Sequence, residues 1–186
     1  MTLEDVEKKP FKTILQETVL KPLGMKSSTF QQPLPNHFLE RATTEHKDGQ
    51  LLEGKRRYFP GLAAGGLWTT PTDLAQFAIE IMLCWSGKSH KILSPTSVVE
   101  MLTCQVGHYD EKAGGQALGF WIQGQGNRLV FAHKGGTYGS ACQLVAFPAV
   151  GQGAIVMANE RPGGEKLVSE TLFAIGTAYG WPWDLG

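Results

Sequence analysis

The chain has 186 residues, of which 42% are hydrophobic and 18% charged, and its 17 Lys and Arg balance 17 Asp and Glu. This composition predicts a globular protein rather than a disordered one, and the even charge argues against a nucleic-acid partner. Apolar runs are helix-length at best and are broken by polar residues, so we expect no membrane span.

The first residues, 1–5, lack the cationic start and apolar stretch of a secretory leader, and this leaves the compartment open. Cys84, Cys104 and Cys142 are far apart and odd in number, without Cys-x-x-Cys spacing. We therefore expect buried free thiols rather than disulfides. No metal site and no other cofactor is predicted.

The N-terminal third predicts one helix and a long irregular segment. A helix is expected from about Phe11 to Leu20, and Pro22 ends it in a tight apolar corner, Pro22-Leu23-Gly24-Met25. One face of that helix carries Phe11, Ile14, Leu15, Thr18 and Val19. Residues 31–61 are rich in Pro, Gly and charge, and long loops of this kind often form the walls of functional sites.

The clearest helix begins at Thr70-Pro71-Thr72-Asp73. Thr70 suits the cap, Pro71 suits the first helical position, and Asp73 is expected to reach back to the backbone amide of the cap. Apolar residues then recur at helical spacing up to Trp85, and Gly87 ends the helix. Ser94-Pro95 predicts the start of a second helix in the same way.

After Gly107 the hydrophobic period becomes alternating, which indicates strands joined by Gly-rich turns. The expected strands are Leu118–Ile122, Arg128–His133, Cys142–Phe147 and Ala154–Ala158, followed by a helix from about Glu165 to Tyr179. Short connections favour antiparallel neighbours. The predicted class is α+β, an antiparallel sheet with flanking helices.

Four segments carry a resemblance to a known family. They are Pro22-Leu23-Gly24-Met25-Lys26-Ser27-Ser28-Thr29-Phe30, Ala63-Ala64-Gly65-Gly66-Leu67-Trp68-Thr69-Thr70 with Asp73-Leu74-Ala75, Leu118-Gly119-Phe120-Trp121, and His133-Lys134-Gly135-Gly136-Thr137-Tyr138-Gly139. In this order they resemble the class C β-lactamase, D-alanyl-D-alanine carboxypeptidase and family VIII esterase group. The last is similar to a His-containing form of that group's Lys-Thr-Gly box.

The resemblance implies a β-lactamase/penicillin-binding-protein-like transpeptidase fold, of which residues 1–186 form a single partial domain, the C-terminal portion. Members of the group use a Ser-x-x-Lys nucleophile and a Tyr-x-Asn loop, both of which precede the Pro22 corner in the family. The sequence contains neither motif. We therefore expect the chain to be inactive alone, its natural partner being the missing N-terminal segment.

The glycine-rich box supplies the candidate site residues. Alternation places His133 and Gly135 on one face of a strand and Lys134 on the other, and the free N–H of Gly136 is suited to bind an oxyanion. His133 and Gly136 are the predicted catalytic residues, and the predicted substrate-binding residues are Lys134, Gly135, Thr137 and Trp121. A competing register places Lys134, rather than His133, at the lysine of the box.

Three interpretations follow: a piece of an active acyl-enzyme hydrolase, a non-catalytic remnant that works as a binding module, or an unrelated α+β domain. The substrate, small molecule or peptide, is a β-lactam, a D-alanyl peptide or a carboxylic ester, and the sequence does not decide among them. The resemblance suggests an extracytoplasmic parent. It also implies that the sheet and the Thr70–Trp85 helix lack N-terminal partners, which would leave one sheet edge and one helix face exposed.

Overall fold

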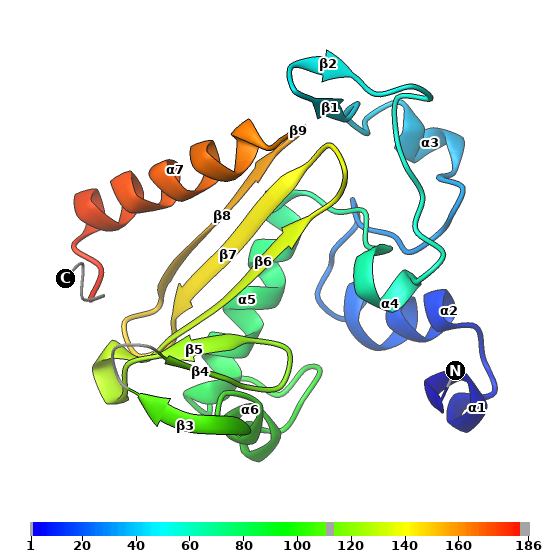
Figure 1. Cartoon of the computed structure of the whole chain (residues 1–186). Coiled ribbons are helices and arrows are strands. Elements are labelled where there is room, and N and C mark those ends of the chain that lie inside the picture. The colour runs from blue at the N-terminus through cyan, green and yellow to red at the C-terminus, as the bar shows by residue number, and fades with distance from the viewer. Residues whose placement is uncertain (1, 111–113, 183–186) are drawn as a thin grey trace.

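A computed structural model describes residues 2–110 and 114–182. The alternating second half of the chain forms a six-stranded sheet (Figure 1). Its strands are β3 (Val106–Asp110), β4 (Gly114–Gln116), β5 (Trp121–Gln123), β6 (Val130–Gly136), β7 (Ala141–Phe147) and β8 (Gln152–Ala158). They lie side by side in chain order, and every neighbouring pair is antiparallel. The predicted α+β class is confirmed.

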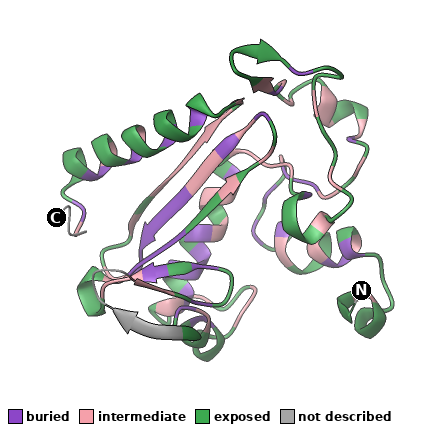
Figure 2. Ribbon diagram, viewed as in Figure 1, coloured by how far each residue is buried: buried purple, intermediate pink, exposed green. Residues whose placement is uncertain are grey.

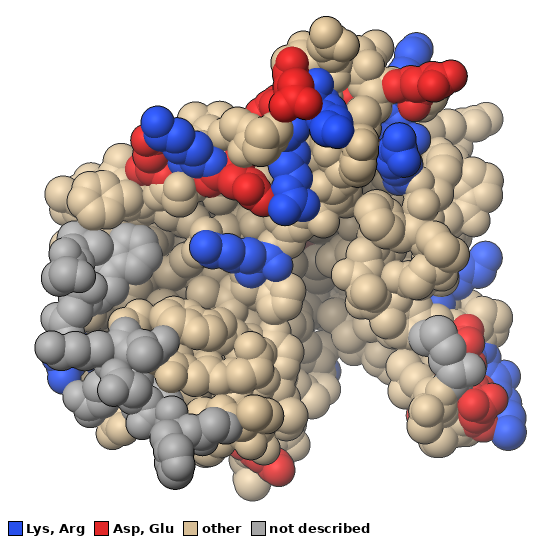
Figure 3. Space-filling model, viewed as in Figure 1, with Lys and Arg blue, Asp and Glu red and all other residues tan. Residues whose placement is uncertain are grey.

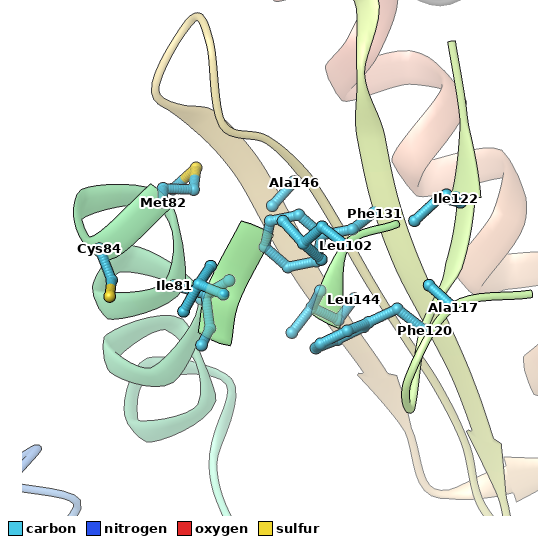
Figure 4. Close-up of a cluster of buried hydrophobic side chains, with 12 residues drawn as sticks. Ile81, Met82, Cys84, Leu102, Ala117, Phe120, Ile122, Phe131, Leu144 and Ala146 are labelled. Carbon is cyan, nitrogen blue, oxygen red and sulfur yellow. The ribbon is translucent and has the colours of Figure 1, made fainter. Parts of the chain in front are cut away.

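Helices cover both faces of the sheet. α5 (Pro71–Trp85) and α6 (Pro95–Met101) pack on one face, and α7 (Gly163–Tyr179) packs on the other (Figure 1). The α5-side core joins Ile81 of the helix to Phe131 and Leu144 of the sheet (Figure 4). The α7-side core joins Val168 and Leu172 to the opposite face of the same strands.

The first third of the chain lies beside the sheet (Figure 1). It contains α1 (Thr2–Glu7), α2 (Phe11–Leu15), a π-helical turn (Gln16–Leu20), α3 (Asn36–Leu39) and α4 (Leu62–Gly65). Much of its surface is exposed, as Figure 2 shows. β1 (His46–Lys47) pairs with β2 (Gln50–Leu51) and, in parallel, with β9 (Glu160–Arg161), which follows β8. This small sheet ties the irregular segment to the end of the large sheet.

Several predicted boundaries shift in the structure. The helix expected over 11–20 changes to π-helical geometry after Leu15, with Lys21 N–H bonded to Gln16 O, and Thr18 is exposed. The strand expected over 118–122 begins only at Trp121, because Gly119 has a φ of +77° and the chain turns there. α1, β3, β4 and the small sheet were not predicted, since each is short and has little hydrophobic periodicity.

The start of α5 confirms one prediction and corrects another. Thr70 Oγ1 accepts a hydrogen bond from Asp73 N–H at 3.2 Å, so Thr70 caps the helix as expected. The Asp73 carboxylate does not return to the cap amide. It accepts instead from Ser27 N–H at 2.7 Å and from Ser28 Oγ at 2.8 Å, because the apolar corner packs directly against the helix start. Ser94 also caps α6 as predicted.

The three cysteines are free, as expected, but only Cys84 is fully buried, whereas Cys104 and Cys142 are half-buried. Within residues 2–110 and 114–182, no helix combines the length and the apolar character needed to cross a membrane.

Candidate functional site

The predicted site residues lie at the end of β6. Phe131 and the cross-strand Leu144 belong to the core on the α5 side, whereas Val130 and Ala132 belong to the core on the α7 side. His133 pairs with Leu144 and follows Phe131 by two residues, so its exposed side chain lies on the face that α5 covers lower down. Lys134 lies on the opposite face. This agrees with the alternation predicted from the sequence.

The backbone N–H of Gly136 points out of the sheet edge. Thr137 N–H donates to Ser140 O at 3.0 Å, so Thr137 and Ser140 are a hydrogen-bonded pair of the β6–β7 hairpin. Hydrogen-bonded and non-bonded pairs alternate along an antiparallel ladder, so the next pair, Gly136 with Ala141, directs its N–H groups away from the partner strand. β5 pairs with β6 only as far as Ala132 and does not cover Gly136. A donor is therefore exposed at this edge.

Gly135 and Thr137, two of the predicted substrate-binding residues, contact other residues of the chain. A Cβ on Gly135 would lie 2.6 Å from Cys142 Sγ, so the sulfur fills the space beside this glycine. Burial raises the pKa of the Cys142 thiol above its ordinary value, which keeps it protonated and a poor nucleophile near neutral pH. Thr137 Oγ1 donates to Glu45 Oε1 at 2.5 Å and lies 2.6 Å from Ser140 Oγ. Both residues thus shape the strand end.

Trp121 and His133 do not lie on the same face of the sheet. Its strand does neighbour β6, as expected, but Trp121 pairs with Ala132, which belongs to the α7-side core. Residues paired across two strands share a face, so Trp121 lies on the face opposite His133. Trp121 is 41% exposed, and its ring packs beside Gly114 instead.

Glu45 is a site residue that the sequence did not single out. Its side chain is 4% exposed, and its two oxygens accept from Thr137 Oγ1 and, at 3.0 Å, from Arg57 N–H. Gly139 makes this contact possible, because a Cβ there would lie 2.7 Å from Glu45 Cβ. One buried carboxylate thereby fastens the irregular segment to the turn after β6. The only sequence signal was an acidic residue within a long loop.

The first two family-like segments meet at the start of α5. Ser28 Oγ contacts both Asp73 Oδ2 and, at 2.7 Å, Thr69 Oγ1, while Thr29 and Trp68 bond each other through both backbone groups. Their side chains hold the apolar corner against the start of α5. These segments therefore have a structural role in this chain.

Figure 3 shows the surface hollowed between the sheet and the N-terminal helices. A shallow hollow farther along the irregular segment is lined by Gln32, Pro33, Tyr58, Phe59, Pro60 and Leu62. None of the predicted site residues lines it. The strand end of β6, rather than this hollow, is the candidate site.

A family model described as Beta-lactamase matches residues 1–178. The chain belongs to the beta-lactamase family. The four quoted segments and the sheet with helices on both faces agree with this assignment. No curated protein matches the chain.

The fold of this chain is also similar to that of solved structures of penicillin-binding-protein homologues and beta-lactamases. An octameric penicillin-binding protein homologue from Pyrococcus abyssi is 19% identical, with a TM-score of 0.74 over 95% of this chain and 39% of its own. A class C beta lactamase from Rhodobacter sphaeroides is 16% identical, with a TM-score of 0.69 over 94% of this chain and 56% of its own.

SurE, solved with D-Leu, is 23% identical, with a TM-score of 0.70 over 100% of this chain and 43% of its own. The beta-lactamase-family chain therefore spans about half the length of these structures, or less.

Proposed function

We propose that this chain is the C-terminal portion of a serine hydrolase that cleaves an ester or amide bond through an acyl-enzyme. The bond belongs to a β-lactam, a D-alanyl peptide or a carboxylic ester. The observation that carries the proposal is the N–H of Gly136, which has no acceptor within residues 2–110 and 114–182 and lies at the sheet edge three residues after His133. Family membership supports the class of chemistry.

In the proposed reaction the substrate carbonyl oxygen lies against Gly136 N–H. A serine from a Ser-x-x-Lys segment attacks the carbonyl carbon, and the charge that develops on the oxygen is stabilised by this donor and by the N–H of the serine itself. The bond to the leaving group then breaks, and the leaving group takes a proton. Water attacks the acyl-serine ester in the second half of the reaction and releases the acid.

His133 is the polar side chain of the box that lies on the same strand as the oxyanion donor, three residues before Gly136. Its exposed imidazole lies on the α5-side face of β6. There it is suited to orient the substrate or to exchange a proton with the leaving group. Cys142, on the same face, is kept protonated by burial and does not substitute for the serine.

The first test is covalent labelling. The isolated chain, incubated with a fluorophosphonate probe and a labelled penicillin, is expected to gain no mass, because no Ser-x-x-Lys occurs in it. Stoichiometric labelling of any serine would contradict this. The genomic sequence upstream of Met1 is then examined for an in-frame Ser-x-x-Lys, and the longer protein is expressed and labelled. Absence of such a segment would favour the non-catalytic binding module.

The second test removes only the oxyanion donor. In the longer protein, Gly136→Pro deletes the N–H, and proline is tolerated where an N–H faces outward from a sheet. We expect kcat/KM to fall about 100-fold, as for loss of one oxyanion donor. Gly136→Ala is the matched control, because it keeps the N–H and its Cβ would lie 3.0 Å from Arg161 Nη1 and 3.4 Å from Ser140 O. Equal effects of the two variants would refute the role of the N–H.

A further inference from the structure

The side chain of Arg161 lies against the backbone of Gly136. A Cβ built on Gly136 would lie 3.0 Å from Arg161 Nη1 and 3.5 Å from the guanidinium carbon. A backbone nitrogen is two bonds from the Cβ of its own residue, so Nη1 lies within about 6 Å of the Gly136 nitrogen. Residue 136 carries no side chain that would hold the guanidinium away. A positive charge therefore lies beside the N–H that is proposed to bind the oxyanion.

Contacts on three sides fix Arg161 in this position. Nη1 donates to Thr137 O, at the end of β6, at 3.2 Å. Nη2 lies 2.7 Å from Oε1 of Glu165, in the first turn of α7. The backbone of Arg161 pairs with Lys47 of β1, and Asp48 N–H donates to Arg161 O at 3.3 Å. The guanidinium is thus held by the strand end, the helix and the small sheet together.

The charge of Arg161 acts on the donor through space. A cation beside an N–H favours negative charge that approaches the hydrogen, and this energy is still sizeable at a separation of about 6–9 Å. The side chain of Arg161 is 44% exposed, so water and Glu165 screen part of the effect. The guanidinium lies on the face of β6 that carries Lys134, opposite His133. Arg161 therefore acts on a bound substrate through Gly136 rather than by touching it.

We propose that Arg161 is a positioning residue of the oxyanion donor. Its guanidinium holds the backbone that follows Gly136 through Thr137 O, and it raises the positive potential at the Gly136 N–H. The N–H then stabilises an oxyanion more strongly than an isolated backbone donor would. This inference deepens the proposed function and rests on it for the oxyanion.

Amide hydrogen exchange measures the potential at Gly136 on the chain as it is. Hydroxide removes the proton of an exposed N–H and leaves a negative charge on the peptide group, so a neighbouring cation speeds the exchange. In the ¹⁵N-labelled chain, followed by water-exchange NMR at mildly alkaline pH, Arg161→Gln should slow the exchange of the Gly136 amide about three- to tenfold at low salt. The difference should shrink as salt is added, because a half-exposed charge is screened.

Controls separate this effect of charge from a change of structure. Arg161→Lys keeps the charge and should restore most of the exchange rate. Lys166→Gln removes the cation of an i,i+4 ion pair within α7 and should leave the rate unchanged. The Thr137 amide, which is bonded to Ser140 O, reports whether the hairpin stays closed. If its exchange accelerates in Arg161→Gln, Arg161→Met supplies the measurement instead.

The outcomes distinguish this inference from the proposed function. An unchanged rate at Gly136 in Arg161→Gln, or equal slowing in Arg161→Lys, would refute the role of Arg161 and leave the proposed function standing. Slowed exchange in Arg161→Gln, together with a longer protein that hydrolyses no ester or amide substrate, would refute the proposed function alone. In an active longer protein, Arg161→Gln should lower kcat by a factor similar to that of the exchange rate, with little change in KM, because the charge acts on the transition state.

Discussion

Replacement of Asp73 by alanine is expected to destabilise the chain by about 3 kcal/mol. The carboxylate is 9% exposed and accepts from Ser27 N–H and Ser28 Oγ, and it links the apolar corner of residues 22–25 to the start of α5. Each hydrogen bond to a charged group contributes about 1.5–3 kcal/mol. The half-buried Ser27 N–H regains water in the variant, and Ser28 keeps Thr69 as a partner, so the loss stays near the low end of the sum.

Urea unfolding measures this effect. With a slope of about 2 kcal/mol per molar urea, the midpoint should fall by about 1.5 M. The single variant Ser28→Ala and the double variant with Asp73→Ala complete a double-mutant cycle. We expect a coupling energy between the two residues of about 1 kcal/mol or more. Glu53→Ala, at an exposed carboxylate without a described partner, is the control and should change stability by less than about 0.5 kcal/mol. If Asp73→Ala lowers the free energy of unfolding by no more than the control does, the contacts of Asp73 with Ser27 and Ser28 do not stabilise the chain.

Four further outcomes are expected. In the longer protein His133→Ala should lower kcat/KM by about ten- to a thousand-fold, whereas Lys134→Ala should cost much less, and the reverse ranking would show that the competing register is right. The hydrogen bond from Lys47 lowers the pKa of Tyr138, so its phenolate should form at a lower pH than that of an ordinary tyrosine in an ultraviolet titration; Lys47→Gln should raise that pKa, and Tyr138→Phe should abolish the step. Glu80→Leu should lower stability by about 2 kcal/mol in a thermal melt, since the buried carboxylate accepts from Ser89 Oγ and Lys91 N–H; an unchanged melting temperature would contradict this. The isolated chain should self-associate in a sizing run, because among the described residues β8 pairs only with β7, and because α5 exposes Ile79 and Leu83; a monodisperse monomer with one cooperative transition would show that residues 1–186 form a complete domain.

Local signals in the sequence were sufficient for the longer elements. Thr70-Pro71 and Ser94-Pro95 start helices because a hydroxyl cap and a proline at the first position satisfy the free amides of the first turn wherever they occur. Alternation over residues 130–136 fixed which side chains share a face of β6, and that predicted the placement of His133 and Lys134. The short strands β3 and β4 escaped prediction because each has only a few residues and glycine carries no periodic signal.

The sequence by itself determined the α+β class, the family and the strand that carries His133 and Gly136, since each depends on local periodicity or on residues adjacent in the chain. Only the tertiary structure decided that Trp121 faces away from His133, because the face of a short strand depends on its register with a neighbour. It also decided that Asp73 binds Ser27 and Ser28, and that Glu45 binds Thr137 and the backbone of Arg57. Those contacts join residues dozens of positions apart, and no local propensity encodes the partner of a buried carboxylate.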